Sequence, residues 1–315
     1  MSKIKILNIQ TLSYSGTTWL NLLLGSHPQA MAIGPPHRLW KSRESNFYDA
    51  CLVHGKECKF WPKFFTEWDQ NENFFVALSR FSGKTIFLMD NADQNFIDET
   101  MNHPDITHLK GRYVRDGRAI TASYARKMKD SGVDYIQSIK PGNWFHASFQ
   151  AIPPLEELYE LGNLVIHYED VVSNQEKFLS QVGSFLNVAY QSDALRFWEK
   201  DHHITCGNTG PIAMIRLEQE LKVAQFESLD VYQEQLSRLR ENPTVSFSDE
   251  RWKVQLDRED LFWFDKIHGD KNEMLGYERD NFTPSEIETF TGVQQEKRGV
   301  LSTLISKLRK PTPPN

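Results

Sequence analysis

The sequence predicts an α/β protein built on a doubly wound parallel sheet flanked by helices, with a helical C-terminal part. Short apolar runs typical of buried strands alternate with stretches of helical periodicity. A loop of small polar residues follows the first of these runs directly. After about residue 192 the strand patterns fade and helical patterns continue. Together these observations favour a parallel sheet covered on both faces.

The first half of the chain supplies the predicted sheet. Residues Lys3 to Ile9 concentrate Ile and Leu as a buried strand does, and the segment Thr17 to Leu24 carries enough apolar side chains for a core-facing helix. Three further strands and three further helices follow from the same patterns. The predicted strands are Thr85–Met89, Leu109–Val114 and Leu164–His167, and the predicted helices are Ala119–Met128, Leu155–Leu161 and Glu176–Leu186.

The second half reads as helices packed around that sheet, over Ile212–Leu239, Arg258–His268 and Pro284–Leu308. Since no clear linker divides the chain, we expect one domain over residues 1–315, with a helical tail at about 284–315. The tail is basic and amphipathic, so it packs on its own domain, pairs with a second copy in a homodimer, or lies on an anionic membrane.

Composition excludes several classes of protein. The 36 Lys and Arg against 42 Asp and Glu give a net charge of −6, which disfavours a nucleic-acid partner. Three cysteines cannot form a dense disulfide framework. The N-terminus has no apolar stretch long enough for a signal peptide or a membrane span, so a cytoplasmic location is expected.

The loop after the first strand reads Ser13-Tyr14-Ser15-Gly16-Thr17-Thr18-Trp19. Such a loop lies at the carboxyl edge of a parallel sheet, where backbone N–H groups and the helix dipole attract anions. Gly16 allows close backbone approach, and Ser15, Thr17 and Thr18 add three hydroxyl groups. The segment therefore has the chemistry of a phosphate cradle, although an ordinary helix N-cap would use the same residues.

A P-loop NTPase would need Gly-x-x-x-x-Gly-Lys-Ser/Thr in this loop. Position 11 is Thr, and Thr17 stands where the lysine would neutralise the β- and γ-phosphates. A small-molecule kinase is therefore a weak alternative.

Two motifs resemble the sulfotransferases that use 3′-phosphoadenosine 5′-phosphosulfate (PAPS), and Trp252 with Leu275-Gly276-Tyr277 resembles the C-terminal pattern of the bacterial and carbohydrate-type branch of that family. Ser15 to Trp19 match the end of that family's first loop, Pro-Lys-Ser-Gly-Thr-Thr-Trp, and Arg115 and Ser123 match its Arg and Ser eight residues apart. The resemblance implies a P-loop-like form of the predicted fold and the following nucleotide-binding residues. They are Tyr14, Ser15, Gly16, Thr17, Thr18 and Trp19 for the 5′-phosphosulfate, Arg115 and Ser123 for the 3′-phosphate, and Gly207 and Asn208 in a segment that closes over the nucleotide or is simply a turn.

The resemblance implies transfer of a sulfuryl group from PAPS to a hydroxyl or amine, with 3′,5′-phosphoadenosine (PAP) as by-product and a small molecule, lipid or glycan as acceptor. Tyr14 stands where the family has a lysine, so Lys84, Lys110 or Arg118 supplies that charge, or Tyr14 donates a hydrogen bond. Arg118 could instead pair with Asp116. Alternatively, the chain binds PAP or PAPS without turnover.

The general base is open as well. The family's His and Glu bases are missing from their expected places, which leaves His37, Asp90 and Asp93 as candidates. His37 has the pKa closest to neutrality, and Asp90 follows directly on a strand. A surface histidine and an N-capping aspartate are the structural alternatives.

Two inserted segments, at about 41–81 and 129–149, are expected on the acceptor side. Their aromatic residues line an acceptor pocket or belong to the core. These residues, with the adjacent Trp40, include Phe60, Trp61, Trp68 and Trp144.

Cys51, His54 and Cys58 have the spacing of zinc ligands. A structural zinc usually needs four ligands, and a second pair is not evident nearby in the sequence. No metal is therefore predicted, and the two cysteines are expected to pack in the core or, in an oxidising compartment, to form a disulfide.

Overall fold

The computed structural model describes residues 3–37, 39, 51–129, 132–161, 163–222, 229–244 and 249–292. The chain divides into two compact units, which are taken in turn. Unit 1 comprises Met1–Arg115 and Leu155–Asp249, and unit 2 comprises Asp116–Pro154 and Glu250–Asn315. Among the described residues, no helix combines the length and the apolar character that crossing a bilayer requires.

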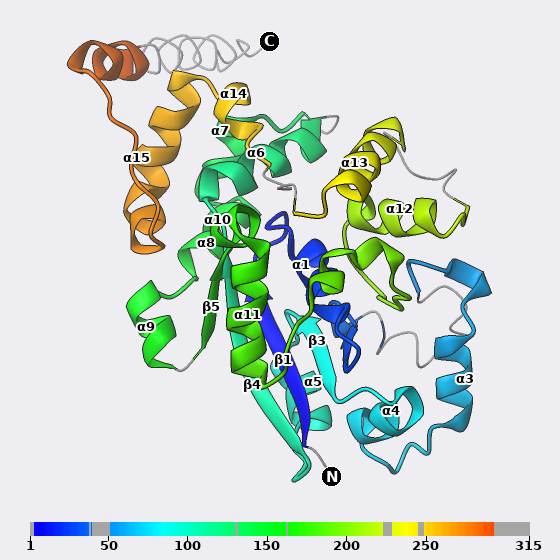
Figure 1. Ribbon diagram of the computed structural model, residues 1–315. Helices are drawn as coiled ribbons and strands as arrows, with labels where there is room; N and C mark the ends of the chain where they lie inside the picture. Colours follow the sequence, from blue (N-terminus) through cyan, green and yellow to red (C-terminus); the bar gives the residue numbers. More distant parts are fainter. Residues whose placement is uncertain are drawn as a thin grey trace, which may run out of the picture. The chain divides into compact units, whose positions relative to one another are not determined.

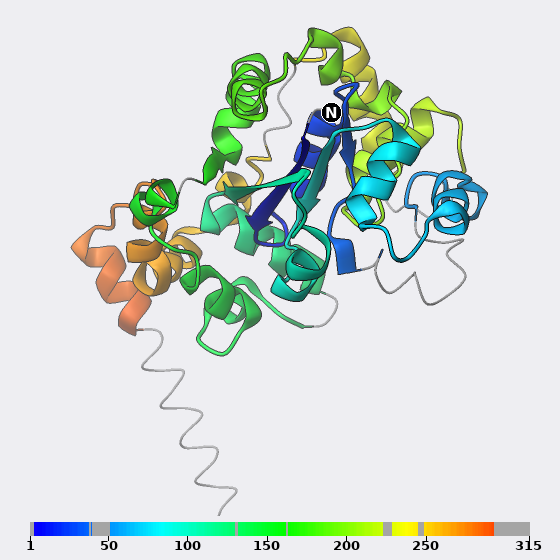
Figure 2. The same cartoon turned by 90° about the horizontal axis from the view of Figure 1, so that it is seen from below.

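Unit 1 contains a five-stranded sheet of order β2-β3-β1-β4-β5, in which every neighbouring pair is parallel. The strands are β1 (Ile4–Thr11), β2 (Ala30–Ala32), β3 (Ile86–Asp90), β4 (Ile106–Val114) and β5 (Leu164–His167). Helices flank this sheet on both faces, which confirms the predicted fold class (Figures 1 and 2). The four predicted strands are present, whereas β2 was missed because three residues give no periodicity.

The helices of unit 1 accompany one apolar core that includes the buried side chains of β1 and β3, and all of them except the one over Leu155–Glu160 contribute residues to it. They are α1 (Thr17–Gly25), α3 (Phe60–Glu67), α4 (Phe74–Ser82), α5 (Gln94–Thr100), α9 (Leu155–Glu160), α10 (Tyr168–Ser173), α11 (Gln175–Leu186), α12 (Thr209–Glu218) and α13 (Leu229–Glu241). Short 3₁₀ turns lie at η1 (Gly55–Glu57), η3 (Ser192–Leu195) and η4 (Phe197–Glu199).

One predicted helix of unit 1 is wrong. The single helix expected over Ile212–Leu239 is two, because α12 ends at Glu218 and α13 begins at Leu229. Glu220 has a φ of 54°, in the left-handed region, which a continuing right-handed helix does not allow.

The aromatic residues of the first insertion belong largely to the core. Trp61 is fully buried and Trp68 is 9% exposed, and both belong to the hydrophobic cluster of unit 1. Phe60 is partly buried and packs against the same cluster. Of the other residues expected to line an acceptor pocket, Trp144 is exposed and Trp40 lies outside the described residues.

Unit 2 is helical in its described part. It contains α6 (Gly117–Met128), α7 (Tyr135–Ile139), α8 (Trp144–Gln150), α14 (Trp252–Gln255) and α15 (Arg258–Met274), and residues 284–292 are helical as well. Phe145, Phe149 and Phe264 pack around the buried His268. Helix α15 starts where predicted and runs six residues further than His268. The basic end of the predicted tail, from residue 293 on, lies outside the described residues.

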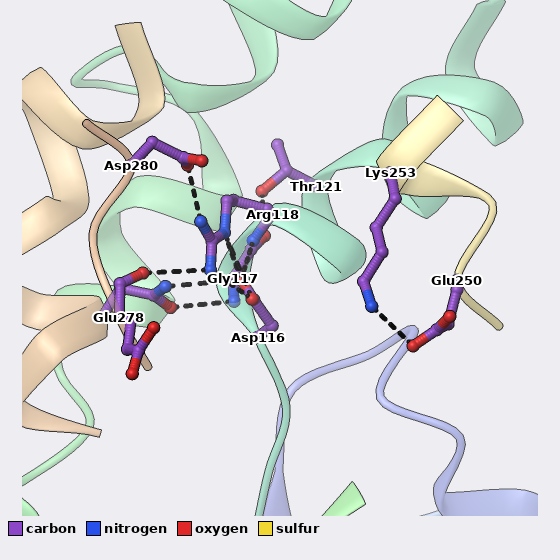
Figure 3. A network of polar contacts seen from close by, with 9 residues as sticks. Asp116, Gly117, Arg118, Thr121, Glu250, Lys253, Glu278 and Asp280 are labelled. Atoms are coloured by element: carbon purple, nitrogen blue, oxygen red, sulfur yellow. Dashed lines mark hydrogen bonds and ion pairs between the residues drawn. The ribbon is translucent and has the colours of Figure 1, made fainter. Parts of the chain in front are cut away.

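A buried ion network holds the start of α6 within unit 2. Figure 3 shows the Arg118 guanidinium directed at two carboxylates. It lies 2.7 Å from Asp116 Oδ2 and 2.6 Å from Asp280 Oδ2, and it also donates to the Glu278 carbonyl at 3.1 Å. Asp116 in turn caps α6 by accepting from the Arg118 backbone N–H at 2.9 Å. Arg118 therefore pairs with Asp116, which was one of the alternatives considered for it.

Removing this guanidinium should destabilise unit 2 strongly. Arg118→Met leaves the carboxylate of Asp116, a residue only 5% exposed, without its counter-ion, and we expect a loss of about 3–5 kcal/mol of unfolding free energy in urea titrations. Lys253→Met is the matched control. It breaks the exposed pair of Lys253 with Glu250, also drawn in Figure 3, and should cost less than about 1 kcal/mol. Equal losses in the two variants would contradict this account.

Candidate functional site

The candidate site lies at the carboxyl edge of the unit 1 sheet, around the loop between β1 and α1. Strand β1 is the middle strand, with β3 on one side and β4 on the other. The chain passes from β1 to β2 and β3 on the first side and then to β4 and β5 on the second. The loop after β1 therefore sits where the winding direction reverses, which is the usual place for ligands in open α/β sheets.

The loop backbone makes a tight turn into α1. Tyr14 has a φ of 69° and Gly16 a φ of 91°, both in the left-handed region. A Cβ on Gly16 would also lie 3.2 Å from the Tyr168 ring, a tight contact that adds to the conformational preference for glycine. No side chain caps α1, and its first turn carries no acidic residue. The N-terminus of α1 thus keeps the positive end of its dipole unopposed by its own side chains.

The three hydroxyl groups of the loop differ in their partners. Thr17 Oγ1 donates to Thr11 Oγ1 at 3.2 Å, and Thr18 Oγ1 accepts from the Asn208 backbone N–H at 2.7 Å. Ser15 is 1% exposed, and its Oγ has no hydrogen-bond partner among the described residues. A buried hydroxyl without a partner is uncommon and suggests a ligand group that completes it.

Arg115 follows β4 and reaches the loop. One terminal nitrogen donates to the Tyr14 carbonyl at 3.0 Å, and the other donates to the Asp249 carbonyl at 2.9 Å and lies 3.5 Å from Asp249 Oδ2. The guanidinium carbon lies 4.2 Å from the centre of the Tyr168 ring. Arg115 therefore brings a buried positive charge to the loop, held by a stacking contact and a carboxylate.

Two more buried polar atoms lack partners in this neighbourhood. Arg115 Nε and the Tyr113 hydroxyl both have no hydrogen-bond partner within the described part of the chain. The Tyr113 hydroxyl lies 3.8 Å from the position of a Cβ on Gly16. Burial raises the pKa of Tyr113 well above its usual value, so this hydroxyl stays protonated and able to donate. With Ser15, the site thus gathers several donors suited to an oxyanion.

The Gly207-Asn208 segment lies against the start of α1. The Asn208 N–H donates to Thr18, and a Cβ on Gly207 would be 2.6 Å from the Thr18 side chain. Asn208 also caps α12 by accepting from the Gly210 N–H at 3.0 Å. The segment therefore makes a helix-capping turn and also contacts Thr18 at the start of α1.

Trp19 and Ser123, which were also predicted to bind the nucleotide, have other contacts in the structure. Trp19 is 4% exposed and packs edge-on against Tyr168, which makes it a core residue. Ser123 belongs to α6 of unit 2, where its hydroxyl accepts from Arg126 at 2.9 Å. Its part in binding stays a prediction from the motif.

The three candidate bases have different environments. His37 is exposed, and Asp93 is an exposed N-cap that accepts from the Phe96 N–H at 2.8 Å. Asp90, the last residue of β3, is 7% exposed and accepts from the Asn21 side-chain amide at 2.7 Å. Burial raises the pKa of Asp90 to about 7, although the bond from Asn21 opposes this shift. A pKa of about 7 suits a group that takes up a proton at neutral pH.

The cations considered for the missing loop lysine do not fill its place within unit 1. Lys84 precedes β3, at the opposite edge of the sheet, and donates to the Pro28 carbonyl at 2.7 Å. Lys110 is an exposed residue within β4. Arg118 belongs to the ion network of unit 2. Arg115 does contact the loop, at the Tyr14 carbonyl.

Sequence reasoning missed three members of the site. Tyr168 had a usable signal, because it directly follows a predicted strand and must lie at the same edge as the loop. Tyr113 looked like any strand residue. Asp249 lies 134 positions from Arg115 along the chain, and no local pattern indicated their pairing.

The raised pKa of Asp90 predicts a pH-dependent stability. The folded protein holds this proton up to about pH 7, whereas the unfolded chain releases it near pH 3.8. The contribution of Asp90 is therefore fully present below about pH 4 and lost as the pH rises to about 7, by up to about 4 kcal/mol. Asp90→Asn should flatten this part of the profile of unfolding free energy between pH 5 and 8. Asp93→Asn, an exposed cap that asparagine also serves, should leave the profile unchanged.

No family model and no curated protein matches this chain. Among solved structures it is similar to the sulfotransferase domain of the curacin biosynthetic pathway, with 17% identity over 75% of this chain and 98% of the other, at a TM-score of 0.44. The sulfotransferase domain of the Synechococcus PCC 7002 olefin synthase has 17% identity over 76% and 95%, at 0.45. Mouse sulfotransferase SULT7A1, solved with PAP, has 12% identity over 85% and 84%, at 0.42. These structural neighbours are sulfotransferases, at identities and TM-scores too low to assign this chain to their family.

Proposed function

We propose that this chain is a sulfotransferase that moves the sulfuryl group of PAPS onto a hydroxyl or amine of a small molecule, lipid or glycan and releases PAP. The observation that carries the proposal is the buried Ser15 hydroxyl, which has no hydrogen-bond partner in the described part of the chain and lies next to an uncapped helix N-terminus and the guanidinium of Arg115. Donors of this kind suit two anionic groups close together.

The two anionic groups of PAPS would use different donors. The loop from Tyr14 to Thr18 would hold the 5′-phosphosulfate through backbone N–H groups and the Ser15 hydroxyl. Arg115 would bind the 3′-phosphate through its paired N–H groups. Gly207 and Asn208 would cover the nucleotide beside Thr18.

In the reaction, the acceptor oxygen attacks sulfur while the bond from sulfur to the bridging phosphate oxygen breaks. Charge then develops on the leaving 5′-phosphate, where the α1 dipole and the loop donors stabilise it. We propose Asp90 as the group that takes the acceptor proton, because its pKa of about 7 suits that step. Asp90→Asn should then bind PAP normally and transfer sulfate about 10²- to 10⁴-fold more slowly.

A binding module without turnover is the second candidate, and Tyr14 favours it. The tyrosine removes a positive charge from the position that faces the leaving group in the resembled motif. Both candidates bind PAP, but only the enzyme consumes PAPS when acceptors are present.

Thermal unfolding with nucleotides tests the shared binding step. PAP at 100 times its dissociation constant should add about 2.7 kcal/mol of stability, whereas AMP and ATP with Mg²⁺ should add much less. Arg115→Ala should abolish most of the PAP effect, and Arg112→Ala, which removes a guanidinium from β4 three residues earlier, should preserve it. No stabilisation by millimolar PAP would refute the proposal. Stabilisation by PAP without any release of PAP from PAPS across a panel of alcohols and amines would favour the binding module.

Asp249 should weaken binding of the 3′-phosphate, since its carboxylate lies 3.5 Å from the Arg115 guanidinium that the phosphate needs. Asp249→Asn removes the competing charge and should tighten PAP binding several-fold in calorimetry while leaving AMP binding unchanged. Glu250→Gln, at a carboxylate that pairs with Lys253 instead, is the matched control. Weaker PAP binding in Asp249→Asn would mean that the carboxylate orients Arg115 for the ligand.

A further inference from the structure

Four potential metal ligands converge in unit 1, away from the phosphate loop. Cys51, His54 and Cys58 come from one short segment around the turn η1, and His203 comes from a segment 145 residues further along the chain than Cys58. Their ligand atoms all lie within 4.8 Å of one another. The fourth ligand that the sequence pattern lacked is therefore supplied by the fold.

The spacing of the ligand atoms fits a tetrahedral metal. Cys51 Sγ lies 3.4 Å from His54 Nδ1, and Cys58 Sγ lies 3.7 Å from His203 Nδ1. Zinc bonds of about 2.3 Å to sulfur and about 2.05 Å to nitrogen, at the tetrahedral angle, place sulfur and nitrogen roughly 3.6 Å apart. Both histidines thus present Nδ1 to one common centre.

The surroundings of the four ligands resemble the outer shell of a metal site. Asp201 faces the other ring nitrogen of both histidines, with Oδ1 3.4 Å from His54 Nε2 and Oδ2 3.4 Å from His203 Nε2. A carboxylate on the distal nitrogen fixes the tautomer that leaves Nδ1 free to bind a metal. The His54 backbone N–H also points at Cys51 Sγ, at 3.4 Å, as a donor that stabilises a thiolate.

The two thiols are buried, and several contacts hold His203. Cys51 and Cys58 are 1% and 6% exposed, and both are free thiols. Phe60 stacks on the His203 ring with centroids 4.3 Å apart, and the Trp61 indole N–H donates to the His203 carbonyl at 2.7 Å. Packing and hydrogen bonds therefore hold the ligands in place and restrict solvent access.

We propose that Cys51, His54, Cys58 and His203 bind one zinc ion as a structural site. Two thiolates and two imidazoles are the donor set that zinc takes in tetrahedral geometry, and four protein ligands leave no open position for catalysis. Neither this proposal nor its test depends on the proposed transfer reaction.

Such a zinc ion would brace the segment that reaches the phosphate loop. After His203, the Ile204 carbonyl accepts from the Leu52 N–H at 2.9 Å, and Thr205 bonds through its N–H and hydroxyl to the Ile33 carbonyl. Three residues later, Asn208 contacts Thr18 at the start of α1. The metal would thus fix one end of the segment from His203 to Asn208, whose other end contacts the candidate nucleotide site.

Metal analysis of the full chain tests the proposal. The wild-type protein, purified under reducing conditions and dialysed against zinc and then against metal-free buffer, should retain about one zinc per chain by mass spectrometry. Cobalt added to metal-free protein should give the visible absorption of tetrahedral Co²⁺ and a sulfur-to-cobalt charge-transfer band. Cys58→Ser and His203→Ala should lose the zinc and both spectral features.

Cys206→Ser is the matched control, because it removes the third cysteine of the chain, which lies outside the cluster, and should keep the zinc. If Cys58→Ser and His203→Ala fail to fold, the zinc content of the wild-type protein still tests the proposal. Three reactive thiols with less than about a tenth of a zinc per chain would overturn the proposal. Equal zinc loss in Cys206→Ser and Cys58→Ser would overturn the assignment of the ligands.

Discussion

The candidate site depends on how β1 pairs between β3 and β4. In the registers of these pairs Ile9 lies opposite Asp90 and Thr11 lies opposite Tyr113, while Val114 lies opposite His167 at the last pair of the sheet. The carboxyl ends of four strands therefore coincide at one edge. Each of these strands ends at this edge. The loop after β1, Asp90, Arg115 and Tyr168 therefore lie at the same edge of the sheet although they are far apart in the sequence.

The charge balance at this edge follows from burial. Arg115 is 5% exposed, and a buried guanidinium needs partners. Tyr168, the Tyr14 carbonyl and Asp249 supply them through stacking, hydrogen bonding and charge. In the proposed complex, a ligand phosphate would take the place of the Asp249 carboxylate, and the charge of the buried Arg115 guanidinium would stay compensated. The hydrogen bond to the Tyr14 carbonyl also links Arg115 to the loop, so the loop backbone helps to hold the guanidinium in place.

The fold was largely predictable because buried strands and core-facing helices repeat apolar residues at fixed intervals. β2 was not predicted because it has only three residues. The break between α12 and α13 was not predicted because the apolar pattern continues across Glu220. Within the site, the loop and Arg115 were predictable because a motif marks them locally. The pairing of Arg115 with Asp249 was not, since it joins residues 134 positions apart with no repeated spacing. Of the candidate bases, Asp90 was marked by its position directly after a predicted strand, whereas its burial and the exposure of Asp93 are properties of the folded chain.

The cysteine and histidine cluster is a second example of a contact that local sequence patterns do not reveal. The local spacing indicated three potential ligands around η1. Because a structural zinc usually takes four, the sequence argued against a metal. The tertiary fold brings His203 close to the other three as the fourth potential ligand. The segment that brings it continues through Thr205 to Asn208, so the geometry of His203 and the contact at Thr18 are set by one short stretch of backbone. A constraint at one end of this stretch limits the positions available to the other end. The rigidity of the loop between β1 and α1 is therefore expected to depend on the cysteine and histidine cluster, even though the loop and the cluster share no residue.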